Sequence, residues 1–185
     1  MPIKKTIGEI LEEMSRTLAH VPPEGLDRLV EAVLSADRIY VAGGGRSGLM
    51  ACAFAMRLMH LGLRTYVVGE TTTPSISSGD LLVSCSASGE TQVTVLVSQV
   101  AQTAGARVFA ITATPDSPMA RLANETIVIG APTKHTPRGV GDSSQYGGSL
   151  FEQAILVLLD AVSAEIGRRL GTAKQDLDAR HANLE

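Results

Sequence analysis

Two short turns rich in serine and glycine most constrain how this chain can fold, because each follows an apolar, strand-like run. The first turn spans residues 43–48 (GGGRSG) and follows the run 38–42 (RIYVA). The second spans residues 86–91 (SASGET) and follows the run 80–85 (DLLVSC). Both lead into helix-like stretches, so each turn would gather unpaired backbone N–H groups, small hydroxyls and the positive end of a helix dipole. That combination is what a phosphate-binding turn needs.

Strand-like and helix-like runs alternate along the whole chain. The predicted strands are nearly continuous apolar runs at residues 38–42, 65–68, 81–85, 107–112 and 125–129. The predicted helices lie at residues 3–20, 24–36, 47–60, 90–104, 117–122, 149–170 and 173–181. Apolar strands of this kind are typical of a parallel sheet that helices cover on both faces. We therefore predict the α/β class: a doubly wound, parallel, five-stranded sheet flanked by helices, with an N-terminal helical segment.

The length and composition indicate one globular domain. The 185 residues are enough for one core, and 44% apolar with 19% charged residues excludes a disordered chain. We expect a single domain over residues 1–185, made of N-terminal helices (1–36), an α/β core (37–170) and a C-terminal helix and tail (171–185). In such a sheet the ligand lies beyond the carboxyl ends of the strands, which is where both turns are expected.

Charge and hydropathy argue against several classes of partner. The net charge of −3 gives no domain-wide basic field for nucleic acid. The sequence shows no apolar run of membrane-spanning length and no signal-peptide pattern at its N-terminus, so we expect a cytoplasmic location without membrane contact.

The cysteines and histidines do not form a metal-ligand pattern in the sequence. Cys52 and Cys85 lie in apolar segments, where reduced core residues are expected. His20, His135 and His181 lack the spacing of metal ligands. We predict neither a metal nor a nucleotide cofactor.

The second turn carries more hydroxyls than a helix cap requires. Ser88 could serve as an N-cap with Thr91 in the first helical turn. However, Ser86, Ser88 and Thr91 together offer three hydroxyls where a cap uses one, which favours phosphate binding. The first turn adds Ser47 but lacks the lysine of a Walker motif and a well-placed acid for a ribose. For that turn alone, a structural turn and an anion site remain equal alternatives.

Several motifs carry a resemblance to a known family. Both turns resemble those of the sugar isomerase (SIS) domain, whose second turn reads Ser-x-Ser-Gly-Glu-Thr. Residues 53–62 (AFAMRLMHLG), 148–152 (GSLFE) and 180–185 (RHANLE) resemble the 6-phospho-3-hexuloisomerases within that family. The similarity runs essentially end to end. Ala87 and Gly44 are minor departures that remove no functional group.

The resemblance implies an isomerase that interconverts D-arabino-3-hexulose 6-phosphate and fructose 6-phosphate through a 2,3-enediol, in the ribulose monophosphate pathway of formaldehyde fixation. The expected phosphate ligands are Ser47, Ser86, Ser88 and Thr91. Candidates for further substrate contacts are Gly45, Arg46 and Gly89. The resemblance also implies a homotetramer whose active sites are shared between subunits, with 3-hexulose-6-phosphate synthase as functional partner.

Two residues are the catalytic candidates, and each has a structural alternative. Glu152 fits a capping box with Ser149, and the residues alone favour that alternative. The apolar helix that follows would partly bury Glu152 and suit a base, whereas the nearby helix N-terminus works against that role. The resemblance assigns the proton abstraction to Glu152. His60 lies near a helix end, where a cation is favourable. The resemblance instead makes His60 a proton carrier that reaches a neighbouring subunit's site.

Other interpretations remain open at this stage. Lys134, His135 and Arg138 lie in a long loop, for which a functional role and a subunit contact are equally plausible. Another SIS-type sugar-phosphate isomerase is an alternative, although the chain lacks the histidine that metal-dependent heptose enzymes carry after the first turn. A non-catalytic sugar-phosphate-binding regulatory protein would need the hydroxyls but neither Glu152 nor His60, and the presence of both favours the enzyme.

Overall fold

The computed structural model describes residues 2–135 and 143–184, and within these ranges it contains one five-stranded, all-parallel sheet with the strand order β2-β1-β3-β4-β5. The strands are β1 (Ile39–Gly43), β2 (Thr65–Val67), β3 (Leu81–Cys85), β4 (Arg107–Thr112) and β5 (Glu125–Val128). The helices are α1 (Pro2–Ala19), α2 (Pro23–Ser35), α3 (Gly45–His60), α4 (Gln92–Thr103), α5 (Pro118–Leu122), α6 (Ser149–Leu170) and α7 (Lys174–Arg180).

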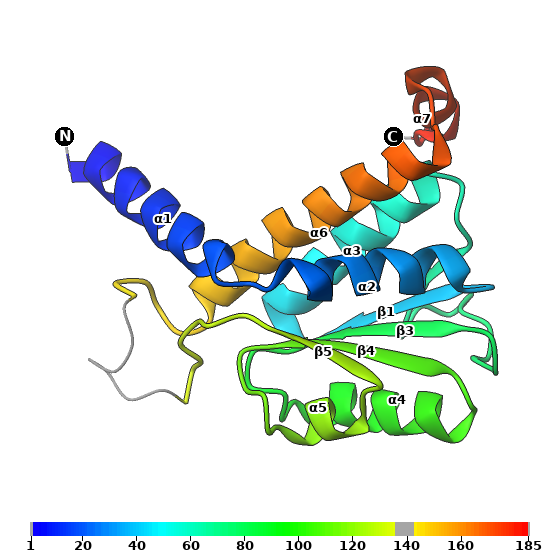
Figure 1. Ribbon diagram of the computed structural model, residues 1–185, viewed down its shortest axis with the longest axis horizontal. Helices are drawn as coiled ribbons and strands as arrows, with labels where there is room; N and C mark the ends of the chain where they lie inside the picture. Colours follow the sequence, from blue (N-terminus) through cyan, green and yellow to red (C-terminus); the bar gives the residue numbers. More distant parts are fainter. Residues whose placement is uncertain (1, 136–142, 185) are drawn as a thin grey trace.

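Helices cover both faces of this sheet, as Figure 1 shows. Helices α2, α3 and α6 lie on one face, and α4 and α5 lie on the other. The predicted α/β class and the doubly wound parallel sheet are therefore confirmed. The finer division of the chain at 36/37 and 170/171 stays a prediction.

The sheet places both serine- and glycine-rich turns at one point of its carboxyl edge. After β1 the chain adds β2 on one side and then crosses to β3 on the other, so the strand order reverses between β1 and β3. In the parallel pairing of these strands, Gly43 lies opposite Cys85, the last residue of each strand. The turns that follow them are thus neighbours at the position where doubly wound sheets bind ligands.

The core is aliphatic and centred on β3 and α6. All five residues of β3 are buried, and α6 buries a set of residues spread around its circumference: Leu150, Phe151, Ala154, Ile155, Leu158, Leu159, Val162, Ser163 and Ile166. Burial raises the pKa of the Cys85 thiol to about 12, which keeps it an inert core residue. The expectation for Cys52 is wrong, because its side chain on α3 is exposed.

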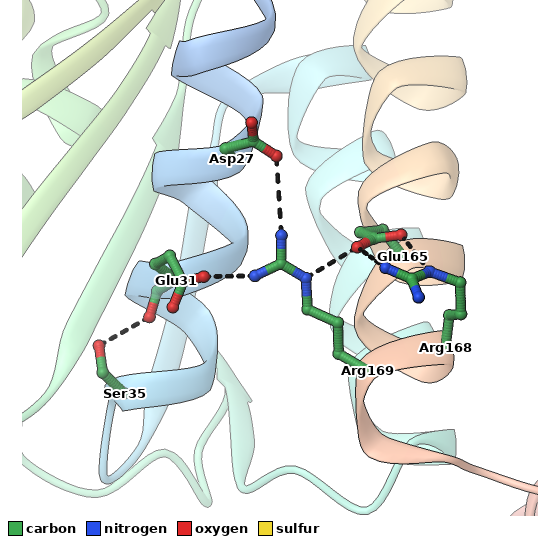
Figure 2. A network of polar contacts seen from close by, with 6 residues as sticks. All are labelled: Asp27, Glu31, Ser35, Glu165, Arg168 and Arg169. Carbon is green, nitrogen blue, oxygen red and sulfur yellow. Dashed lines mark hydrogen bonds and ion pairs between the residues drawn. The ribbon is translucent and has the colours of Figure 1, made fainter.

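A polar network fastens α2 to the C-terminal half of α6 (Figure 2). The Arg169 guanidinium lies between the two helices, where it contacts Asp27 and Glu31 of α2 and Glu165 of α6. Arg168 pairs with Glu165 as well, at 2.7 Å. Because several of these side chains are well exposed, the network directs the packing of α2 more than it adds to stability.

Helix α1 projects from the body of the molecule and packs mainly against α6 (Figure 1). Its Ile3, Ile7 and Leu11 side chains, spaced four residues apart, are exposed. None of the described helices is long and apolar enough to cross a membrane.

An ion pair between Arg38 and the buried Asp80 lies at the opposite, amino edge of the sheet. The Arg38 guanidinium donates to both carboxylate oxygens of Asp80, at 2.9 and 2.7 Å, and the backbone N–H of Ser77 donates to Asp80 at 2.7 Å. Burial would raise the pKa of Asp80, but the hydrogen bonds from Arg38 and Ser77 outweigh it and hold this pKa below its ordinary value of 3.8.

We expect Asp80→Asn to destabilise the fold by about 2 kcal/mol at pH 7, because it leaves Arg38 without its charge partner. A carboxyl whose pKa is lowered on folding stabilises the fold above its ordinary pKa and loses that contribution as the pH falls through the folded value. The difference in unfolding free energy between wild type and variant should therefore shrink below about pH 3.8. Urea denaturation at several pH values measures it, with the exposed neighbour Asp37→Asn as control. An unchanged difference at pH 2.5–3 would contradict the assignment.

Candidate functional site

The first turn is made of glycine because the chain crosses itself closely. A Cβ at Gly43 would lie 2.8 Å from the backbone of Gly48, and a Cβ at Gly48 would lie 2.6 Å from the Gly43 carbonyl oxygen. Gly45, the first residue of α3, has a positive φ of 55°, which glycine adopts without strain. This tight turn leads directly into Ser47, which is buried at the start of α3.

The second turn arranges its hydroxyls among themselves. The Ser86 hydroxyl accepts a hydrogen bond from the Gly89 N–H and lies 3.1 Å from the Thr91 hydroxyl. The Ser88 hydroxyl accepts from the N–H of Glu90, two residues on. Helix α4 begins at Gln92 with Thr91 at the N-cap position. Ser88 therefore is not the N-cap, and the capping alternative for Ser88 is wrong.

Gly89 lets the second turn press against α5. Its φ is +62°, and a Cβ there would lie 2.0 Å from the Ser117 hydroxyl oxygen. Ser117 caps α5 by accepting from the N–H of Ala120, and the N–H of Met119 donates to the Gly89 carbonyl. The short helix α5 thus packs directly against the serine turn. Gly89 shapes this turn and is not among the described residues that line the cavity described next.

The two turns and the start of α6 enclose a cavity of about 320 Å³. The turns approach each other where a Cβ at Gly44 would lie 3.1 Å from the Thr91 methyl group. The candidate residues that line the cavity are Arg46, Ser47, Ser86, Ser88, Thr91 and Glu152. Residues from distant parts of the sequence therefore share one cavity at the carboxyl edge of the sheet.

Glu152 forms an ion pair with Arg46 in the lining of this cavity. Its carboxylate lies 2.8 Å from the Arg46 Nε, and its side chain is 17% exposed. The capping-box alternative is wrong, because α6 begins after Gly148, and a glycine N-cap has no side chain to complete such a box. The glutamate belongs to the cavity and not to a helix cap.

The loop before α6 contributes further lining residues. Lys134 and Tyr146 reach the cavity, together with Gly147 and Gly148. The sequence analysis left Lys134 open and missed Tyr146, since an isolated tyrosine ahead of two glycines carries no pattern. His135 is exposed and is not among the described lining residues, and Arg138 lies outside the residues that the structure describes.

His60 lies at the other end of α3, away from this cavity. Its buried ring stacks on His181 with 5.1 Å between ring centroids, and the Arg180 side chain donates to its carbonyl oxygen at 3.1 Å. Burial first, and then the nearby His181 and Arg57, lower the pKa of His60. The neutral ring is therefore favoured at neutral pH, which argues against a helix-end cation. His60 and His181 line a second cavity of about 830 Å³ between α3, α6 and α7.

In the part of the chain that the structure describes, no group of three or more histidine, cysteine or acidic side chains is placed to hold a metal ion. Among the described residues, hydroxyls, the Arg46 guanidinium, the Lys134 ammonium and the Glu152 carboxylate are the polar side-chain groups that line the 320 Å³ cavity.

Comparison with known proteins identifies the family. The SIS domain model matches residues 33–155. A 3-hexulose-6-phosphate isomerase from Mycobacterium gastri is 44% identical over 99% of this chain and 92% of its own length. The chain belongs to the SIS domain family, in the group of the 3-hexulose-6-phosphate isomerases.

Two further members of this family align along their whole length. A 3-hexulose-6-phosphate isomerase from Bacillus subtilis is 37% identical over 100% of both chains. A Methanococcus jannaschii protein, whose crystal structure was used to infer a molecular function of 3-hexulose-6-phosphate isomerase, is 32% identical with a TM-score of 0.82. That superposition covers 98% of this SIS-domain chain and 99% of the other. The resemblance to the SIS family, carried by the two turns, and to its 6-phospho-3-hexuloisomerases, carried by residues 53–62, 148–152 and 180–185, is confirmed.

The two positive-φ glycines of the turns make a matched pair for a stability test. At Gly45 a Cβ would meet no atom of the described residues within 4 Å apart from its chain neighbours and its own helix backbone, so Gly45→Ala should cost the backbone strain of about 1 kcal/mol. Gly89→Ala adds a collision with Ser117 and should cost about 3 kcal/mol or more. Urea denaturation of both variants measures the difference. Equal losses would show that the second turn does not depend on close contact with α5.

Proposed function

We propose that this chain is a 3-hexulose-6-phosphate isomerase, which interconverts D-arabino-3-hexulose 6-phosphate and fructose 6-phosphate in the cytoplasm. It would serve the ribulose monophosphate pathway of formaldehyde fixation, downstream of 3-hexulose-6-phosphate synthase. The observation that carries the proposal is the cavity that serine hydroxyls and Glu152 line together, in a chain 44% identical to an isomerase of this name. A sugar phosphate would bind with its phosphate at the hydroxyls and its carbonyl end near Glu152.

The phosphate end is supported by the hydrogen bonding of the second turn. The Ser88 hydroxyl accepts a backbone N–H, which leaves its hydrogen available for donation. The Ser86 hydroxyl also accepts a backbone N–H and shares a hydrogen bond with the Thr91 hydroxyl, so one of these two hydroxyls keeps its hydrogen for a phosphate oxygen. Ser47 lies at the start of α3 and Thr91 just before α4, where helix dipoles favour an anion. The turns would bind the remote phosphate and thereby orient the sugar.

The chemical end requires one base that moves a proton between neighbouring carbons. The carbonyl passes from C3 to C2 through a 2,3-enediol, so the proton removed next to the carbonyl must be returned to the adjacent carbon. We assign this transfer to Glu152, since its carboxylate lines the cavity and Arg46 fixes its direction. This transfer needs no nucleotide or metal.

A coupled assay tests both the function and the base. Supplied with 3-hexulose 6-phosphate, the wild type should form fructose 6-phosphate at a rate that a chelator does not change, and inorganic phosphate should inhibit competitively. Glu152→Gln keeps the shape but removes basicity, so turnover should fall about a hundredfold or more. Its thermal midpoint and its affinity for fructose 6-phosphate should remain close to those of the wild type.

The exposed Glu24, in the first turn of α2, provides a matched control as Glu24→Gln. Loss of wild-type activity in chelator would favour a metal-dependent isomerase instead. Sugar-phosphate binding without turnover would favour a regulatory protein. Near-normal turnover of Glu152→Gln would remove Glu152 from the chemistry.

His60 enters the proposal as a residue of a neighbouring subunit in a homotetramer. The 16 residues of α3 span about 24 Å, so His60 cannot reach the cavity at the start of its own helix. A neutral imidazole can donate at one nitrogen and accept at the other, which suits proton movement between the two sugar oxygens.

Complementation tests the shared site. His60→Ala and Glu152→Gln oligomers should each be nearly inactive, and mixing them by co-refolding should restore activity. In mixed oligomers some cavities pair an intact Glu152 with an intact His60 from another chain. Differently tagged chains and size-exclusion chromatography establish that mixed oligomers form. If they form and remain inactive, His60 does not act in a neighbour's site.

A further inference from the structure

Glu13 of α1 is a buried carboxylate to which the proposed reaction assigns no role. Glu13 is only 6% exposed, although most residues of α1 are exposed. From the described residues its two oxygens accept four hydrogen bonds. They come from the Ser143 hydroxyl at 2.8 Å, the Ser144 N–H and hydroxyl at 2.9 Å each, and the Gln145 side-chain amide at 3.0 Å.

These bonds outweigh the cost of burying the charge. Burial raises the pKa of Glu13, but the hydrogen bonds from Ser144, Gln145 and Ser143 lower it by more than burial raises it, so that the pKa is about 2. A carboxylate offers enough lone pairs to accept from all these donors at once, whereas a carboxamide offers one oxygen. The charge thus fits this group of donors specifically.

The donors belong to the segment that enters the cavity wall. Residues 143–145 precede Tyr146, Gly147 and Gly148, which line the cavity, and then α6, whose first turn carries Glu152. The N–H of Ser149 donates to the Tyr146 carbonyl, and the N–H of Glu152 to the Gly148 carbonyl, so this stretch is one connected unit. A carboxylate on α1 therefore fixes the strip of chain that leads to the proposed base.

We propose that Glu13 is a positioning residue of the active site: it holds residues 143–148 so that Glu152 faces the serine turns. The inference rests on the proposed function. Glu13 itself is not among the described residues that line the cavity, so it acts through the segment it binds. The phosphate hydroxyls lie on other elements, after β1 and β3, and the hydroxyl hydrogen bonds described for the second turn are made within that turn and not to Glu13 or to residues 143–145.

This separation predicts a split between turnover and phosphate binding. In Glu13→Gln, kcat should fall about tenfold or more, because small displacements of a reacting group cost large factors in rate. The inhibition constant of inorganic phosphate should stay within about twofold, since its site lies on independent elements. Glu12→Gln, an exposed neighbour on the same helix, is the control and should change neither quantity. Because a loss of folded protein would lower the apparent kcat without changing the inhibition constant, kcat is expressed per folded enzyme, with the folded fraction taken from circular dichroism.

A second variant and a second measurement decide the outcome if folding is affected. Ser144→Ala removes one hydroxyl donor and keeps the backbone N–H, so it should lower kcat in the same direction and add little in the Glu13→Gln background. Hydrogen exchange of backbone amides 143–152 should be faster in Glu13→Gln than in wild type and unchanged in Glu12→Gln.

The possible results separate the two hypotheses. An active wild type whose Glu13→Gln variant keeps its kcat, or loses kcat and phosphate affinity together, overturns the inference and leaves the proposed function intact. A wild type that does not turn over 3-hexulose 6-phosphate overturns the proposed function. Exchange then decides whether Glu13 holds the segment: faster exchange in Glu13→Gln alone supports this, and equal exchange overturns it.

Discussion

Gly43 and Cys85 pair at the ends of β1 and β3, and this pairing decides where the two turns leave the sheet. Because the strand order reverses between these strands, the segments that follow them diverge into α3 and α4 and leave a crevice between them. The close approach of Gly43 to Gly48 keeps the first turn short, and Gly89 keeps the second one close to α5. The serine hydroxyls therefore face one cavity as a direct result of strand pairing and glycine placement.

The strands and the two turns could be predicted from the sequence because the patterns that determine them are local. A continuous apolar run specifies a buried strand, and a serine- and glycine-rich turn after it specifies where the backbone changes direction. The hydroxyls of Ser47, Ser86 and Ser88 follow from these local patterns, and the structure brings them together in one cavity. By contrast, the ion pair between Arg46 and Glu152 joins two separate segments, and their sequence positions give no signal of it.

Local motifs failed where a tertiary partner competed for the same side chain. Ser149 and Glu152 fit a capping box, but the Glu152 carboxylate binds Arg46 and the helix begins after a glycine. Ser88 fits an N-cap, but that motif failed for a local reason instead, because the Ser88 hydroxyl accepts from the N–H of Glu90, two residues on, before α4 begins. Glu13 shows the opposite case, since an acid in a polar helix indicates a solvated face until residues 143–145 approach it. Sequence patterns do not reveal the contacts of Glu152 and Glu13, because their partners lie far away along the chain.

Helices α3 and α6 run side by side in the same direction, and this arrangement limits what one chain can do alone. Arg46 meets Glu152 at their first turns, whereas Arg57 faces Asp160 and Leu61 faces Gly167 further along. The same packing that places Glu152 at the carboxyl edge of the sheet places His60 at the amino edge. A packed pair of helices cannot slide by its own length without exposing the core that α6 buries. If both residues serve one reaction, they must therefore come from different chains, and the quaternary structure becomes part of the active site.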